Sequence, residues 1–267
     1  MDTVSIEPRT LYSLLGSPNA PLVVDVRKDA AYEEDPHLIA GAVRPQGDLT
    51  AFVQRHACGR PVVAYCVKGA EVGIGAASTL AQAGFAASFV AGGLKAWRAE
   101  RLPTIRRRAE WHVPGGSRWI TRERPKIDRI ACPWLIRRFI DPLARFDYVP
   151  TAQVFEQARA RQAVPYDIAN APVTHRGERC SFDALIEDFD LADPALDRLA
   201  TIVRGADTDR LDLAPQSAGL LAASLGLSQR FTDDHDMLAH ALPMYDALYA
   251  ECRARVAGEH EVHRWNA

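Results

Sequence analysis

One cysteine stands where an apolar strand would give way to a helix of small residues. Cys66 follows the apolar run 62–65 and precedes a short loop containing Gly69 and then the alanine-rich stretch 73–83. A strand-to-helix turn directs successive backbone N–H groups into one small concavity, which can hold an anion and favour thiolate over thiol. Cys66 is therefore the candidate nucleophile, and the turn suits sulfur chemistry.

The residues around Cys66 alternate between apolar strands and helical segments. The runs 22–27, 62–65 and 87–90 read as strands, and the segments 48–56 and 73–83 have the composition or apolar spacing of helices. Alternation of this kind implies a parallel sheet with helices on both of its faces. We therefore predict an α/β domain in which such a sheet positions Cys66.

Six blocks of the first 103 residues carry a recognisable pattern: Asp25-Val26-Arg27, His37-Leu38-Ile39-Ala40-Gly41-Ala42, the Cys66 loop, Ala83-Gly84-Phe85, Gly92-Gly93-Leu94-Lys95-Ala96-Trp97 and Leu102-Pro103. With these blocks in family order, residues 5 to about 103 resemble a single rhodanese domain. The resemblance implies a ping-pong sulfurtransferase: the cysteine takes sulfane sulfur from a small anionic donor such as thiosulfate, holds it as a persulfide, and passes it to a thiol or a cyanide-like acceptor. It implies that no cofactor is required for this transfer.

The resemblance also assigns roles within the loop from Cys66 to Glu71, whose six-residue length is associated with sulfur rather than phosphate substrates. Lys68 would face the anionic donor, and Gly69 lets the backbone turn without steric conflict. Glu71 departs from the family's pattern, since many members carry a basic or neutral residue there. The residues expected to bind substrate are Val67, Lys68, Gly69, Ala70, Glu71 and Val72.

Two residues of the neighbouring strand are expected to support this loop. Asp25 and Arg27 end the predicted strand 22–27, from which their side chains can fix the loop. For Cys66 itself the alternative is an unreactive buried thiol, which free cysteines often are.

The chain is long enough for two ordinary domains, because it has 267 residues. Val113-Pro114-Gly115-Gly116-Ser117 breaks all periodicity, so we expect a domain at 1–103, a linker at 104–120 and a second domain at 121–267. Residues 104–145 hold eleven basic and four acidic side chains, whereas residues 146–267 hold eleven and twenty. We expect this basic belt to pair within the chain, with nucleic-acid contact as the alternative.

Cysteine usage indicates a reducing compartment. The five cysteines, at positions 58, 66, 132, 180 and 252, form neither a C-x-x-C pair nor a disulfide framework. No apolar run approaches the roughly 18 residues of a membrane span, and no apolar signal core follows Met1. We therefore expect a cytoplasmic protein without membrane insertion.

The second half reads as mainly α-helical, with short strands at 146–149 and near Val164. Five stretches of this half carry a further pattern: the segment 124–141, which begins Arg124-Pro125-Lys126, then Thr174-His175-Arg176-Gly177-Glu178-Arg179-Cys180-Ser181-Phe182-Asp183, the segments 202–208 and 213–221, and Tyr245-Asp246-Ala247-Leu248-Tyr249. Through these stretches, residues 121 to about 255 resemble the C-terminal domain of ChrB-type chromate-resistance proteins. That resemblance implies an association with chromate or oxidative stress.

Several side chains of this second half are types that bind metals. Imidazole together with carboxylate suits iron, manganese or zinc, so His175, Glu178, Asp207 and His235 are candidate ligands of an ion whose identity the residues do not specify. The alternative is ordinary: such residues also serve as helix caps, end charges or satisfied histidines.

Three functions follow from these patterns. A sulfurtransferase using Cys66 is the one we favour, because the loop around Cys66 supports it. A stress-responsive regulatory or binding protein with Cys66 as sensor is the second, and a metal-dependent enzyme in the C-terminal domain is the third.

Overall fold

The computed structural model describes residues 4–111 and 115–259, which form two compact units. Unit 1 comprises residues up to Arg118 together with Leu135–Arg145 and Glu187–Leu191, and unit 2 comprises the remainder. Positions 1–3 and 260–267 of the two predicted domains, and 112–114 of the predicted linker, lie outside the described residues. Each unit is described by itself.

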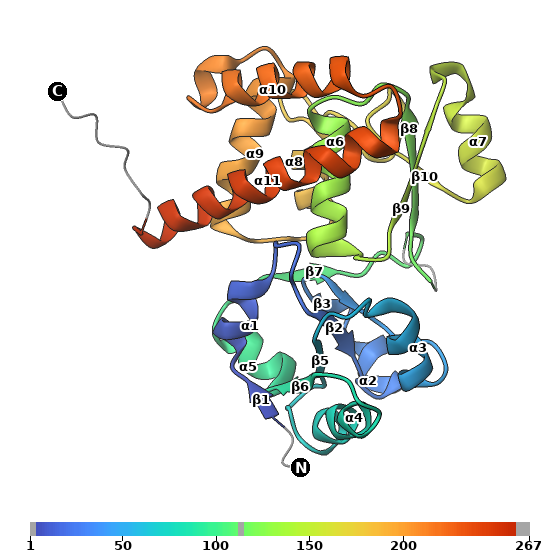
Figure 1. Cartoon of the computed structure of the whole chain (residues 1–267), viewed down its shortest axis with the longest axis vertical. Helices are drawn as coiled ribbons and strands as arrows, with labels where there is room; N and C mark the ends of the chain where they lie inside the picture. Colours follow the sequence, from blue (N-terminus) through green and yellow to red (C-terminus); the bar gives the residue numbers. More distant parts are fainter. Residues whose placement is uncertain (1–3, 112–114, 260–267) are drawn as a thin grey trace. The chain divides into compact units, whose positions relative to one another are not determined.

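Unit 1 is built on a five-stranded parallel sheet with strand order β1-β6-β5-β2-β4 (Figure 1). Its register places Val23 beside Val63 and Val24 beside Ala64. The α/β fold with a parallel sheet predicted for this half is thereby confirmed. The sheet strands are β1 (Val4–Ile6), β2 (Leu22–Asp25), β4 (Ala42–Val43), β5 (Val62–Tyr65) and β6 (Ala87–Val90), and β3 (His37–Ile39) pairs antiparallel with β7 (Thr104–Arg106).

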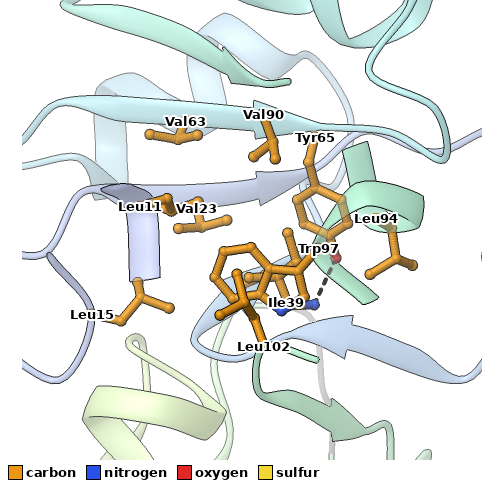
Figure 2. Close-up of a cluster of buried hydrophobic side chains, with 11 residues drawn as sticks. Leu11, Leu15, Val23, Ile39, Val63, Tyr65, Val90, Leu94, Trp97 and Leu102 are labelled. Atoms are coloured by element: carbon orange, nitrogen blue, oxygen red, sulfur yellow. Dashed lines mark hydrogen bonds between the residues drawn. The ribbon is translucent and has the colours of Figure 1, made fainter. Parts of the chain in front are cut away.

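Alternate residues of the central strands enter two separate apolar clusters, because successive side chains of a strand point to opposite faces. Val23, Val63 and Tyr65 join α1 (Pro8–Leu14) and α5 (Gly93–Ala99) in the cluster of Figure 2. Val24 and Ala64 pack instead with α3 (Leu49–His56) and α4 (Glu71–Gln82). The remaining helix is α2 (Asp29–Glu34). Helices therefore cover both faces, as the alternating pattern indicated.

Two later segments of the chain complete unit 1. The N–H of Gly41 donates to the carbonyl of Phe139 at 2.6 Å, and the N–H of Arg106 donates to the carbonyl of Phe189 at 2.8 Å. Unit 1 is thus discontinuous in sequence, which the predicted boundary at 103 did not anticipate. The predicted linker 104–120 also contains regular structure, because β7 lies within it and β8 begins there at Arg118.

Unit 2 is mainly helical and carries a three-stranded sheet with the order β10-β8-β9. Its strands are β8 (Arg118–Arg122), β9 (Arg145–Val149) and β10 (Val164–Pro165), and α7 (Val154–Arg161) packs on Ile120 and Val149. The other helices are α6 (Asp128–Leu135), which continues as a π-helical turn over Ile136–Ile140, then α8 (Ser181–Asp188), α9 (Pro194–Asp207), α10 (Ser217–Arg230) and α11 (Asp234–Ala257) (Figure 1). Single 3₁₀ turns occur at Thr151–Gln153 and Leu211–Leu213.

The helices of unit 2 share an aromatic core around Trp134 of α6. Its ring centroid lies 6.4 Å from those of Phe182 and Tyr245 and 5.5 Å from that of Tyr249. Its indole N–H donates to Asp246 at 2.8 Å. Helices α6, α8 and α11 are thereby held together. None of the described helices is both long and apolar enough to cross a membrane.

Candidate functional site

Cys66 lies at the carboxyl end of β5, a central strand of the unit 1 sheet, and is only 6% exposed. Its backbone carbonyl accepts from the N–H of Leu94 at 2.9 Å, and that of Val67 accepts from the N–H of Lys95 at 3.0 Å. Both donors belong to the first turn of α5, whose N–H groups have no partner within their own helix. The start of the loop is therefore tied to α5.

Glycines let the backbone segments around the loop approach one another. Gly69 has φ +62°, and a Cβ added there would lie 2.5 Å from the carbonyl oxygen of Val90. Gly93 has φ +60°, and its added Cβ would lie 2.3 Å from the carbonyl oxygen of Cys66. Larger residues would clash with backbone at both places, so the loop conformation depends on these glycines.

The sulfur of Cys66 faces the first turn of α4. A Cβ added to Gly73, the third residue of that helix, would lie 3.3 Å from the Sγ atom. Helix N-termini carry N–H groups that stabilise negative charge. Glycine at this position leaves room for sulfur this close to the turn without displacement, which suits a sulfur atom that becomes anionic.

The predicted substrate-binding residues follow Cys66 along the loop and differ in their exposure. Val67, Lys68, Ala70 and Glu71 are exposed, whereas Val72 and Gly69 are half-buried. Lys68 and Glu71 thus place opposite charges on one short loop. A dianionic donor would meet less attraction there than Lys68 alone would provide.

Asp25 and Arg27 form a buried ion pair behind the strand that carries Cys66. The Nη2 atom of Arg27 lies 2.7 Å from Oδ2 of Asp25, and both side chains are fully buried. The hydroxyl of Tyr65, the residue before Cys66, donates to the same oxygen at 2.9 Å. It also accepts from the N–H of Ile39 (Figure 2). This network connects β2, β3 and β5.

The buried pair shifts the pKa values of its members. Burial alone would lower the pKa of Arg27, but its hydrogen bonds to Asp25 and the nearby Tyr65 and Asp35 outweigh burial, so that pKa is raised. Burial and the adjacent Asp25 raise the pKa of Tyr65 well above its usual value. The guanidinium therefore stays charged and the phenol neutral, which preserves the network at the base of the loop.

A second cluster of functional side chains lies in unit 2, where three helix ends meet. Asp128 begins α6, Asp207 ends α9, and Ser181 begins α8. The Nε2 atom of His175 lies 3.1 Å from a carboxylate oxygen of Asp207 and 3.6 Å from one of Asp128. The ligand atoms of these three residues all lie within 4.8 Å of one another.

Backbone N–H groups at the start of α8 hold the carboxylate of Asp128 in place. Its carboxylate accepts the backbone N–H groups of Ser181 at 2.6 Å and Phe182 at 3.0 Å, the first two residues of α8. Burial, and then the nearby carboxylates of Asp167 and Asp207, raise the pKa of Asp128 to about 6 in spite of the opposing hydrogen bond from His175.

A third carboxylate, Asp167, approaches the same imidazole at 3.4 Å but has further partners of its own. The Ser181 hydroxyl donates to it at 2.8 Å, and the guanidiniums of Arg129 and Arg122 lie 3.4 and 3.6 Å away. The three surrounding carboxylates of Asp128, Asp167 and Asp207, through hydrogen bonding and their negative charge, raise the pKa of His175 to about 12. The cluster thus concentrates negative charge around one imidazole.

Two of the four predicted metal ligands meet, and two do not. His175 and Asp207 belong to the cluster. Glu178 occupies the tip of a tight turn between Arg176 and Arg179, and it lines a separate cavity of about 720 Å³. His235 lies in the first turn of α11, with its ring 5.5 Å from that of Tyr148.

Asp128 and Asp167 were not predicted as site residues. The sequence does contain a signal for Asp128. It lies between Ile127 and Ile130 in an apolar segment, and a carboxylate buried in such a segment rarely lacks a partner. For Asp167 we find no comparable signal in the sequence.

Arginines of the basic belt pair with carboxylates of the same chain, as expected. Arg107 binds Glu33 at 3.0 Å in unit 1, and its guanidinium lies 4.1 Å from the ring centroid of Tyr32. In the same unit Arg108 lies 3.5 Å from Asp188. Part of the positive charge at 104–145 is therefore neutralised internally.

Comparison with known proteins agrees with both halves of this description. The model of the rhodanese-like domain family matches residues 7–100, and that of the ChrB C-terminal domain family matches residues 119–252, half of the chain. Residues 7–100 are therefore a rhodanese-like domain. The chain belongs to the ChrB C-terminal domain family, with the rhodanese-like domain preceding that region.

Individual relatives cover parts of the chain. Protein ChrB of Cupriavidus metallidurans is 34% identical over 135 residues, which are 50% of this chain and 40% of that protein. The chain thus spans less than half of this curated relative. The solved rhodanese-like domain of an Anabaena protein is 30% identical, with 42% of this chain and 86% of that chain covered and a TM-score of 0.34. A thiosulfate sulfurtransferase of Pseudomonas aeruginosa is 26% identical, with 40% of this chain and 20% of that chain covered and a TM-score of 0.34.

Proposed function

We propose that this protein transfers sulfane sulfur through a persulfide on Cys66. One observation carries the proposal: the Cys66 sulfur lies against the N-terminal turn of α4, where Gly73 provides the space. Membership of a rhodanese-like family supports the same class of chemistry. The ChrB family region supports a role in resistance to chromate or to oxidative stress.

Two half-reactions make up the proposed transfer. The Cys66 thiolate attacks the outer sulfur of a donor such as thiosulfate, the S–S bond of the donor breaks, and sulfite leaves with the electron pair. An acceptor thiolate or cyanide then attacks the outer sulfur of the persulfide, and the Cys66 thiolate is released. The N–H groups at the start of α4 would stabilise the anionic sulfur in both steps.

Each part of unit 1 has a role in this proposal. The exposed Lys68 attracts the anionic donor, while the nearby Glu71 favours donors of lower charge than thiosulfate. Asp25, Arg27 and Tyr65 keep the end of β5 rigid, so that the sulfur keeps its place beside α4. The small anionic donor and the thiol or cyanide-like acceptor are the partners that this chemistry requires.

Intact-mass measurement tests the covalent step. The full chain, incubated with thiosulfate and separately with mercaptopyruvate, should gain one sulfur of about 32 Da that cyanide removes. Cys66→Ser should gain nothing. Cys58→Ser removes the exposed cysteine of the chain's described part and should load like the wild type.

Two outcomes would overturn the proposal. Absence of a cyanide-labile gain with either donor would leave unit 1 as a binding or sensing module. A gain that persists in Cys66→Ser but disappears in Cys58→Ser would place the reactive sulfur on the wrong cysteine.

A further inference from the structure

More carboxylates surround the Nε2 atom of His175 than one N–H group needs as hydrogen-bond acceptors. Three carboxylates, those of Asp207, Asp167 and Asp128, lie 3.1, 3.4 and 3.6 Å from one Nε2 atom. A ring nitrogen carries at most one hydrogen, so a single carboxylate would satisfy it. Bringing three carboxylates together also carries a repulsive cost, which an additional cation would relieve.

The distances within the cluster match those between ligands of one metal ion. Donor atoms about 2.1 Å from a common ion are separated by about 3.0 Å at adjacent octahedral positions and about 3.4 Å at tetrahedral ones. His175 lies 3.1 Å from Asp207 and 3.6 Å from Asp128. An ion bound here would replace the hydrogen on Nε2 of His175, whose proton leaves to solvent, and the ligand atoms of all three residues already lie within 4.8 Å of one another.

The surroundings hold the ligands as a metal site requires. Carboxylate ligands are usually oriented by further hydrogen bonds, and Asp128 receives two from the start of α8. Asp207 uses its Oδ1 atom to accept the backbone N–H of Asp128 at 3.4 Å, while Oδ2 faces His175. Asp167 is engaged by Ser181, Arg129 and Arg122, which places it in an outer, orienting position.

We propose that Asp128, His175 and Asp207 of unit 2 bind one first-row divalent cation. A set of one imidazole and two carboxylates suits Zn²⁺, Mn²⁺ or Fe²⁺. The buried thiol of Cys132 adjoins the cluster, 3.6 Å from Asp128.

The cluster is also accessible to an ion from solvent. The His175 side chain is 40% exposed and that of Asp207 is 17% exposed, whereas Asp128 is fully buried. Three protein ligands leave coordination positions for water or a small molecule, as in catalytic rather than purely structural metal sites. This inference concerns unit 2 and is independent of sulfur transfer at Cys66.

Metal counting tests the site. The full chain is stripped with a chelator, dialysed separately against Mn²⁺ and Zn²⁺, and its bound metal is measured by mass spectrometry. The wild type should retain about one equivalent of at least one ion, as expected for a three-ligand site. His175→Gln and Asp207→Asn should each weaken binding by about tenfold or more.

Two conservative variants provide matched controls. Glu178→Gln and His235→Gln alter residues of the same types that lie away from the cluster, so both should bind metal like the wild type. Asp207→Asn should stay folded, because removing a negative charge from the C-terminal end of α9 favours the helix. Its thermal unfolding midpoint should then rise less with added metal than that of the wild type.

The proposal is overturned if the wild type binds neither ion stoichiometrically. It is equally overturned if folded His175→Gln and Asp207→Asn retain wild-type affinity, because the metal would then bind elsewhere.

Discussion

Replacing Gly73 by alanine should separate sulfur chemistry from folding. The new methyl carbon would lie 3.3 Å from the Cys66 sulfur and 3.7 Å from its backbone nitrogen. Contacts of 3.4–4 Å are ordinary for a Cβ atom, so the sulfur must move by a few tenths of an ångström. The persulfide needs still more room at the same place, since it carries a second sulfur.

Two opposing effects determine the stability of Gly73→Ala. Alanine in place of glycine favours a helix by about 0.5–1 kcal/mol. Crowding of a well-packed site costs about 1–3 kcal/mol. We therefore expect a net loss of at most about 2.5 kcal/mol in the free energy of unfolding, which leaves the protein folded.

Gly73→Ala should change the rate of sulfur loading more clearly than it changes the stability of the fold. Misplacing a nucleophile raises the activation free energy, and each 1.4 kcal/mol added to it slows a reaction about tenfold. We therefore expect the rate of persulfide formation to fall at least about tenfold. Time-resolved intact mass after thiosulfate addition measures the rate, and urea unfolding measures stability.

Gly75→Ala is the matched control for this prediction. Gly75 lies in the same helix, but a Cβ added there has no neighbour within 4 Å. This variant should gain about 0.5–1 kcal/mol of stability and load sulfur normally. Folded Gly73→Ala that loads at the wild-type rate would show that the space beside α4 is irrelevant to the sulfur, and the reasoning would fail.

Two further predictions concern the scaffold of the loop. Asp25→Asn leaves the buried Arg27 without its principal carboxylate, so the free energy of unfolding should fall by roughly 3–5 kcal/mol; an unchanged urea midpoint would contradict a buried ion pair. At Gly93 the backbone has a positive φ, and the Cβ of an alanine there would lie 2.3 Å from a backbone oxygen. At Gly59 the φ is also positive, but an added Cβ would have no neighbour within 4 Å. Gly59→Ala should cost about 1–2 kcal/mol and Gly93→Ala at least about 1 kcal/mol more; equal urea midpoints would show that the loop relaxes around the clash.

Much of unit 1 could be predicted because its information is local. The apolar runs 62–65 and 87–90 became β5 and β6, and the segment 48–56 became α3 with Asp48 as its N-cap. Such elements follow from residue type and spacing over a few positions. The predicted strand 22–27 ends at Asp25, since β2 passes there into the polar network of Arg27.

The contributions of distant segments to each unit were not predictable in the same way. Strand β8 was missed, although Trp119-Ile120-Thr121 after two glycines has the composition of a short strand. The return of residues 135–145 and 187–191 to unit 1 involves contacts between positions far apart in the sequence, such as the hydrogen bond from Gly41 to Phe139 and the ion pair of Arg108 with Asp188. Hydrogen bonds of this kind leave no periodic signal in the sequence.

Sequence alone determined the Cys66 loop, because its nucleophile, glycine turn and following helix are contiguous. Only the tertiary structure decided which polar residues of the second half meet. Asp128, His175 and Asp207 are brought together by the packing of two helix ends and a loop from three parts of the chain. Glu178, only three residues from His175, is separated from it by a tight turn. Proximity along the chain thus defines a loop, whereas a site built from separate elements depends on how their side chains pack.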